Sequence, residues 1–172
     1  RATISSMSQP LGNAIGNSLE VIEAIETLKG KGPQDLEELC LKAGSTMLVQ
    51  AKLYQDEKEA YKALQEVISN GKALEKLKEM VQRQGGDVSY IENPELFEKP
   101  SVGRMTKDED VDHAVGLVLN KKIGDHVEIG ETLLTVYARN ELSQELLNEI
   151  YQSYTIVDEF VEKPILIEEI MK

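Results

Sequence analysis

The chain has 172 residues, 41% of them hydrophobic, which is enough for one ordinary domain or two small ones. Its formal net charge of −12 repels nucleic-acid phosphates and anionic lipid, so we expect no nucleic-acid partner and no membrane partner. A small-molecule ligand is not excluded, because a local pocket can bind it whatever the overall charge. Neither a membrane span nor a signal peptide is recognisable, and a cytoplasmic protein is therefore expected.

The first sixteen residues are predicted to form the end of a strand and then a loop. Residues 7–12 (Met-Ser-Gln-Pro-Leu-Gly) indicate the loop, because proline removes a donor and glycine permits unusual dihedral angles. Leu11 and Ala14 precede the next predicted helix, and Glu23 lies within it. Loop carbonyls near a carboxylate are hard oxygen donors that suit a cation, although Glu23 could equally be a surface glutamate.

Four helices are predicted between residues 17 and 84 from their 3.6-residue hydrophobic periodicity. The first begins at Asn17, which stands at capping-box spacing from Glu20, and ends at Gly30. The third begins at Asp56 and ends at Asn70-Gly71, and the fourth ends at Gly85-Gly86.

The second helix follows Gly32-Pro33, where Asp35 and Glu38 repeat the capping-box spacing. Its apolar face is predicted to consist of Leu36, Leu39, Cys40, Ala43, Met47 and Leu48. The single cysteine is therefore expected to be a small buried hydrophobic residue.

After residue 95 the composition shifts toward residues that favour strands. Strands are predicted at residues 115–119 and 132–138, a helix at residues 143–151, and edge strands at residues 155–157 and 165–167. We therefore predict an α+β fold, in which an all-α helical bundle segment is followed by a small mixed α/β module. The boundaries are residues 1–95 for the helical and cleft-loop segment and residues 101–172 for the C-terminal module.

The residues that most often carry chemistry do not form a convincing set in the second module. His113 and His126 have no nucleophile and acid that would complete a catalytic group. The alternating acidic residues have the spacing that opens an EF-hand loop, but the required glycine and bidentate glutamate are replaced; these residues are Asp108, Asp110 and Asp112.

Residues 124–131 (Gly-Asp-His-Val-Glu-Ile-Gly-Glu) resemble the hairpin of biotinyl and lipoyl carrier domains. Those domains carry a modifiable lysine on a second hairpin, flanked by Met or by acidic residues. No lysine with such neighbours is recognisable in this sequence. A turn that needs two glycines explains the same residues. A non-enzymatic carrier or interaction module therefore stays as an alternative function.

A resemblance to one enzyme family covers nearly the whole chain. Residues 7–12, followed by residues 14–17 (Ala-Ile-Gly-Asn) and 19–21, closely resemble a segment of pyrimidine-nucleoside and thymidine phosphorylases. The similarity continues at residues 32–33, 35–36, 38–41, 70–73, 85–87, 103–107, 114–116 and 122–125.

The resemblance implies phosphorolysis, in which phosphate attacks the anomeric carbon of uridine, thymidine or deoxyuridine and a pentose 1-phosphate is formed. It also implies a homodimer in which an all-α domain faces a mixed α/β domain across a cleft. The family's phosphate- and base-binding motifs precede the segment matched here, so no catalytic or substrate-binding residue can be assigned, and the chain alone is expected to be inactive.

The resemblance further implies a monovalent-cation site, expected to hold potassium. Its ligands in this sequence would be the main-chain oxygens of Leu11 and Ala14 and the carboxylate of Glu23. The other ligands in the family come from the phosphate-binding loop, so the ion would brace that loop rather than take part in bond breaking.

The chain departs from the family at two places. Ser6 stands where the family commonly has Asp, and residues 100–103 join segments that the family separates by a strand-bearing stretch. Either residues are missing from this numbering or the variant is shortened. A related phosphoribosyltransferase is a further alternative, because those enzymes share the helical and α/β layout.

Overall fold

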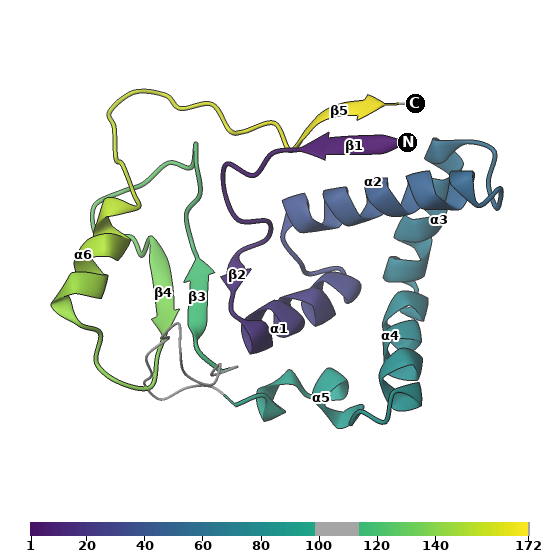
Figure 1. Ribbon diagram of the computed structural model, residues 1–172, viewed down its shortest axis with the longest axis horizontal. Coiled ribbons are helices and arrows are strands. Elements are labelled where there is room, and N and C mark those ends of the chain that lie inside the picture. The colour runs from purple at the N-terminus through teal and green to yellow at the C-terminus, as the bar shows by residue number, and fades with distance from the viewer. Residues whose placement is uncertain (99–113, 172) are drawn as a thin grey trace. The chain divides into compact units, whose positions relative to one another are not determined.

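The computed structural model describes residues 1–98 and 114–171, and its fold is α+β, as predicted (Figure 1). The chain forms two compact units. Unit 1 comprises residues 1–13, 21–96 and 165–172, and unit 2 comprises residues 14–20 and 97–164. Each unit is assembled from separate stretches of the chain. The two predicted segments, by contrast, were continuous and followed one another in sequence.

The four predicted helices are present between residues 17 and 84. They are α1 (Asn17–Leu28), α2 (Gln34–Gln50), α3 (Glu57–Ser69) and α4 (Lys72–Arg83), followed in unit 1 by α5 (Ser89–Glu92) and the 3-10 helix η1 (Pro94–Leu96). The third helix was predicted to begin at Asp56, which is its N-cap: the carboxylate accepts hydrogen bonds from the amides of Lys58 and Glu59 at 2.5 and 3.3 Å.

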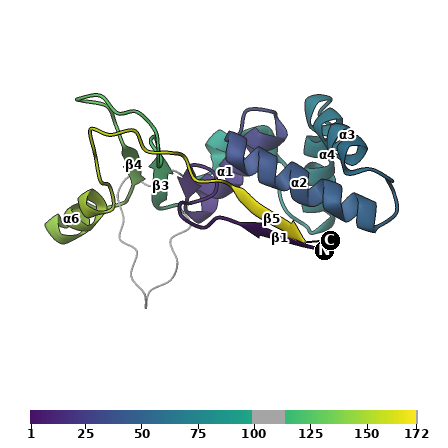
Figure 2. The same ribbon diagram turned by 90° about the horizontal axis from the view of Figure 1, so that it is seen from above.

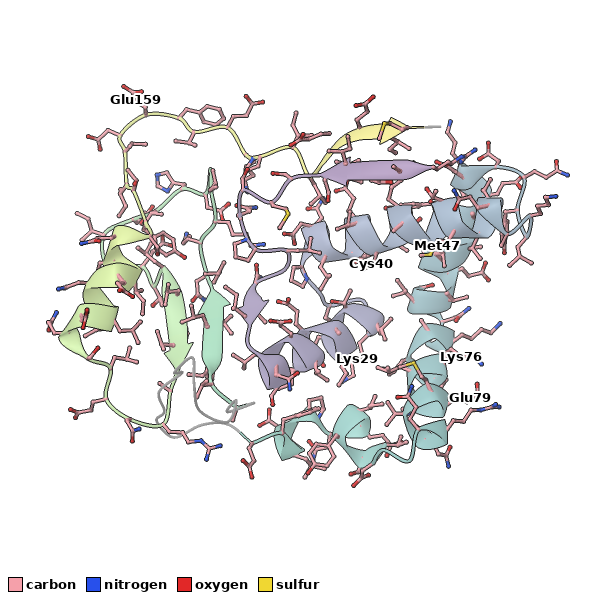
Figure 3. All side chains as sticks on the ribbon, in the orientation of Figure 1. Lys29, Cys40, Met47, Lys76, Glu79 and Glu159 are labelled. Atoms are coloured by element: carbon pink, nitrogen blue, oxygen red, sulfur yellow. The ribbon has the colours of Figure 1, made fainter. Side chains whose placement is uncertain are left out.

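The buried face of α2 is displaced from the predicted one. Leu41 is buried, whereas Cys40 and Met47, both labelled in Figure 3, are exposed. A Cβ on Gly44 would lie 2.8 Å from Cδ1 of Leu64, so α2 approaches α3 closely along the face that holds residues 41 and 44. The prediction that Cys40 is buried was wrong, because the packing uses the stripe one residue further along the helix.

A two-stranded antiparallel sheet in unit 1 joins distant parts of the sequence. Strand β1 (Ala2–Ser5) pairs with β5 (Ile167–Met171), and the two lie side by side in Figures 1 and 2. The register places Thr3 opposite Ile170, and the amide of Ser6 donates a hydrogen bond to the carbonyl of Leu166 at 3.0 Å. The edge strand predicted at residues 165–167 was misplaced, because residues 165 and 166 lie outside a strand and β5 begins at Ile167.

Unit 2 contains a three-stranded antiparallel sheet in the order β2 (Ala14–Ile15), β3 (Gly116–Leu119) and β4 (Leu134–Tyr137), followed by α6 (Gln144–Gln152). The strands predicted at residues 115–119 and 132–138 and the helix at 143–151 are thus confirmed. The absence of a side chain at Gly116 lets β2 approach, since a Cβ there would lie 2.1 Å from the carbonyl oxygen of Ile15.

The strand predicted at residues 155–157 is wrong, because this segment is irregular. Ile156 and Val157 are 68% and 50% exposed, so their branched side chains do not pack on a sheet. β-branched residues favour a strand only where a neighbouring strand and a buried face are available.

Among the residues that the structure describes, no helix is long and apolar enough to cross a membrane.

Candidate cation site in the loop before α1

The loop that precedes β2 and α1 contacts the carboxylate of Glu23. This side chain is half-buried on α1, and its Oε1 accepts a hydrogen bond from the amide of Asn13 at 2.9 Å. A Cβ on Gly12 would lie only 2.2 Å from Oε2 of Glu23. The carboxylate therefore faces the loop backbone, which is not the position of a surface glutamate that extends into solvent.

A second carboxylate, on Asp35 of α2, contacts the same loop. Its Oδ2 accepts a hydrogen bond from the amide of Gly12 at 3.3 Å, and its Oδ1 accepts one from the amide of Leu36 at 2.9 Å. The sequence predicted Asp35 as a helix cap, but Pro33 precedes the first turn of α2 and Asp35 lies within that turn. Sequence reasoning missed this role, because an acidic residue near a helix start is most simply interpreted as a cap.

Of the three expected ligands, Leu11 and Glu23 belong to unit 1 and Ala14 belongs to unit 2. Leu11 is exposed and directly precedes Gly12, whereas Ala14 is buried and pairs with Val118 as part of β2. Glu23 contacts the backbone between these two positions. Main-chain carbonyls and a carboxylate are hard oxygen donors, which suit an alkali or alkaline-earth cation better than a soft metal.

The remaining metal-ligand candidates offer no competing centre. In residues 1–98 and 114–171, no three side chains of His, Cys, Asp or Glu come together as a metal-binding group. The acidic residues at 108, 110 and 112 and His113 lie outside the described residues. His126 lies in the connection between β3 and β4, where its main-chain oxygen accepts a hydrogen bond from Lys121 at 2.8 Å.

Position 6, where the family resemblance leads one to expect Asp, has a local role that serine can fulfil. The hydroxyl oxygen of Ser6 accepts a hydrogen bond from the amide of Ser8 at 3.2 Å and lies 3.1 Å from the hydroxyl of Ser8. Serine hydroxyls and aspartate carboxylates both stabilise turns through this type of contact. Ser6 therefore stabilises a turn at the start of the loop.

The connection between β3 and β4 is a turn that hydrogen bonds stabilise. Gly124 and Gly130 both have positive φ angles, of 81° and 91°, as a turn with two required glycines demands. Asp125 accepts hydrogen bonds from Lys163 at 2.6 Å and from the amide of Lys122 at 2.9 Å, and these bonds lower the pKa of its carboxyl group.

The hydroxyl of Tyr154 contacts both ends of this turn. It lies 3.1 Å from the carbonyl oxygen of Lys121 and 3.3 Å from that of Leu133, so it can donate to either. Partial burial raises the pKa of this phenol. The contacts within residues 120–133 explain the glycine-rich pattern as a structural turn.

Comparison with known proteins relates the chain to nucleoside-cleaving enzymes. Residues 1–74 match the glycosyl transferase family, a/b domain, and residues 101–157 match the pyrimidine nucleoside phosphorylase C-terminal domain. The chain is 43% identical to the pyrimidine-nucleoside phosphorylase of Bacillus subtilis (strain 168), over 92% of this chain and 43% of the relative. It is 42% identical to that of Staphylococcus aureus (strain USA300), over 99% of this chain and 46% of the relative.

These matches first define the chain as a member of a glycosyltransferase class, through the α/β domain that its first 74 residues match. Within that class, the chain belongs to the pyrimidine-nucleoside phosphorylase family. It spans less than half the length of the two relatives.

Two further consequences follow from the same comparisons. The match to the Staphylococcus aureus relative extends over 199 residues although this chain has 172, so the relative contains residues without a counterpart here. The C-terminal-domain match also includes the turn at residues 124–131. This turn is therefore accounted for as part of a phosphorylase domain, and no observation favours the carrier or the phosphoribosyltransferase alternative.

Proposed function

We propose that this chain forms part of an enzyme that transfers a pentosyl group from a pyrimidine nucleoside to phosphate. In this reaction a phosphate oxygen bonds to the anomeric carbon while the glycosidic bond breaks, and its electron pair leaves with the base. The products are the free base and a pentose 1-phosphate. The observation that carries the proposal is the 43% identity to the Bacillus subtilis relative over 92% of the chain.

The proposed contribution of the loop before α1 is to hold a monovalent cation, potassium. Its ligands are the main-chain oxygens of Leu11 and Ala14 and the carboxylate of Glu23. The fit is supported by the position of that carboxylate, which lies against the backbone of Gly12 and Asn13. When bound, the ion would supply a fixed positive charge that holds oxygen donors of separate segments together.

The residues described here are proposed to position and stabilise rather than to take part in bond breaking. No described residue is assigned to phosphate or base. Binding of phosphate and nucleoside, assembly as a homodimer and a cytoplasmic location belong to the same proposal and rest on the family relationship.

The activity is tested by measuring the release of uracil from uridine in the presence of inorganic phosphate. The 172-residue polypeptide is assayed alone and together with a second polypeptide that contains the part of the Bacillus subtilis relative without a match here. We expect no turnover from the chain alone and phosphate-dependent turnover from the pair.

Turnover by the chain alone would contradict the assignment of the chemistry to residues outside it. A pair that associates in size-exclusion chromatography and binds uridine, yet releases no uracil, would refute the proposed activity. Omitting phosphate serves as the matched control, because simple hydrolysis of the nucleoside does not require it.

A further inference from the structure

Asp35 contacts the proposed cation-binding loop from a different helix than Glu23 does. We infer that Asp35 is a positioning residue of this site, which orients the carbonyl group of Leu11 toward the ion. The inference rests on the proposed cation site, but it concerns a residue that contributes no ligand of its own.

The argument depends on the peptide group that joins Leu11 to Gly12. The carbonyl of Leu11 and the amide N–H of Gly12 belong to the same planar unit, and in a trans peptide they point in opposite directions. Asp35 accepts a hydrogen bond from this N–H at 3.3 Å. Because the plane is rigid, holding the N–H also fixes the direction of the carbonyl oxygen.

The same hydrogen bond affects the charge on that oxygen. A carboxylate that accepts from a peptide N–H polarises the peptide group, and hydrogen-bonded chains of this kind strengthen one another in a partly buried environment. Gly12 is buried and Asp35 is half-buried, so water competes only in part. The Leu11 carbonyl should therefore carry more negative charge and bind a cation better than a carbonyl without this contact.

The next peptide group, which joins Gly12 to Asn13, is held in a similar way by Glu23 of α1. The amide of Asn13 donates to Glu23 at 2.9 Å, so two successive amides are each held by a carboxylate from a different helix. Gly12 permits this arrangement, because its φ of +69° is in the left-handed region and it has no Cβ to displace Glu23. The loop backbone is therefore held by carboxylates of both α1 and α2.

The scaffold that holds Asp35 is a regular helix. Asp35 lies in the first turn of α2, and its other carboxylate oxygen accepts from the amide of Leu36 at 2.9 Å. Groups outside the ligand set that orient the ligands of a metal change its affinity by roughly 10–100-fold when they are removed. For a carbonyl ligand of a monovalent ion we expect the lower end of that range.

The test measures how potassium raises the melting temperature of the 172-residue chain paired with the second polypeptide of the activity assay, because the remaining ligands of the family's site precede the segment matched here. Potassium chloride is titrated against tetramethylammonium chloride at constant ionic strength, and the potassium concentration at half the maximal shift is compared between variants. We expect Asp35→Ala to raise this midpoint roughly tenfold. Asp35→Asn keeps an oxygen acceptor without the charge, and it should raise the midpoint only about threefold.

Two further variants separate this role from general destabilisation. Asp56→Ala removes a carboxylate that caps α3, so it should lower the melting temperature and leave the potassium midpoint unchanged. Glu23→Ala removes a proposed ligand and should abolish the potassium-specific shift.

A wild-type pair without a potassium-specific shift would overturn the cation site itself. A shift that Glu23→Ala abolishes but Asp35→Ala leaves at its wild-type midpoint would overturn the role of Asp35 alone. If Asp35→Ala does not fold, Asp35→Asn decides the question, because an unchanged midpoint in that variant would also refute the inference.

Discussion

Replacement of Gly12 by alanine tests whether the loop and Glu23 form one coupled unit. The new Cβ would lie 2.2 Å from Oε2 of Glu23, so the carboxylate must move away and give up its hydrogen bond to Asn13. Loss of a hydrogen bond to a charged, half-buried group costs about 1.5–3 kcal/mol. The φ of +69° adds about 1–2 kcal/mol for a residue with a side chain, so we expect a total loss of about 3 kcal/mol or more.

The same substitution should cost less once Glu23 is absent. In a Glu23→Ala background, no carboxylate opposes the Cβ and no hydrogen bond is lost, so only the backbone cost of about 1–2 kcal/mol remains. A double-mutant cycle measured by urea unfolding with circular dichroism should give a coupling energy of about 1.5–3 kcal/mol. Gly30→Ala is the matched control, since its φ is 75° and its Cβ would meet nothing within 4 Å.

Additive effects would refute this reasoning. If the free energies lost in Gly12→Ala and Glu23→Ala sum to that of the double variant within about 0.5 kcal/mol, then Glu23 does not contact the loop in solution as it does in the structure. The control should remain additive with Glu23→Ala in either case, because Gly30 has only a conformational cost.

Three further predictions concern unit 2. The depressed pKa of Asp125, due first to its bond with Lys163, means that its stabilising effect is present above the usual value of 3.8 and is lost as the pH falls through the lower folded-state value. Asp125→Asn should therefore flatten the pH dependence of the unfolding free energy below about pH 4. Tyr154→Phe removes a hydroxyl that can donate to either of two carbonyl groups and should cost about 1 kcal/mol in urea unfolding. Gly116→Ala should raise amide exchange in the β2–β3 pair, because its Cβ would lie 2.1 Å from the carbonyl oxygen of Ile15.

Each of these outcomes has a result that would contradict it. An unchanged acid dependence in Asp125→Asn would show that the bond with Lys163 does not persist in solution. Equal stability of Tyr154→Phe and the wild type would remove the role given to the hydroxyl. Unchanged amide protection in Gly116→Ala would show that the two strands are less closely paired than in the structure.

The local parts of the fold could be predicted from the sequence, because they depend on neighbouring residues. Periodicity and terminal signals located α1 to α4, and α3 begins one residue after its predicted start at Asp56. The strands β3 and β4 and helix α6 also follow from short-range patterns. These elements are stabilised mainly by residues a few positions apart, which is what a sequence pattern records.

The errors concern features that distant residues decide. Asp35 has the spacing of a helix cap, but its hydrogen-bond partner Gly12 lies 23 residues away. Cys40 fits a helical stripe, yet the close approach at Gly44 selects the stripe beside it. The proposed ligands came from family resemblance, since spacing alone did not separate Glu23 from a surface residue. Hydrogen bonding from Asn13 is a contact that no local pattern reveals.

The pairing of β1 with β5 has a consequence for the order in which this protein folds. The pairing closes a loop that runs from residue 5 to residue 167, and closing so long a loop carries a larger entropic cost than closing a short one. Its hydrogen bonds should therefore acquire protection later than those of α2 and α3 in pulse-labelled hydrogen exchange. During synthesis, β1 could find its partner only after the residues through β5 had been made.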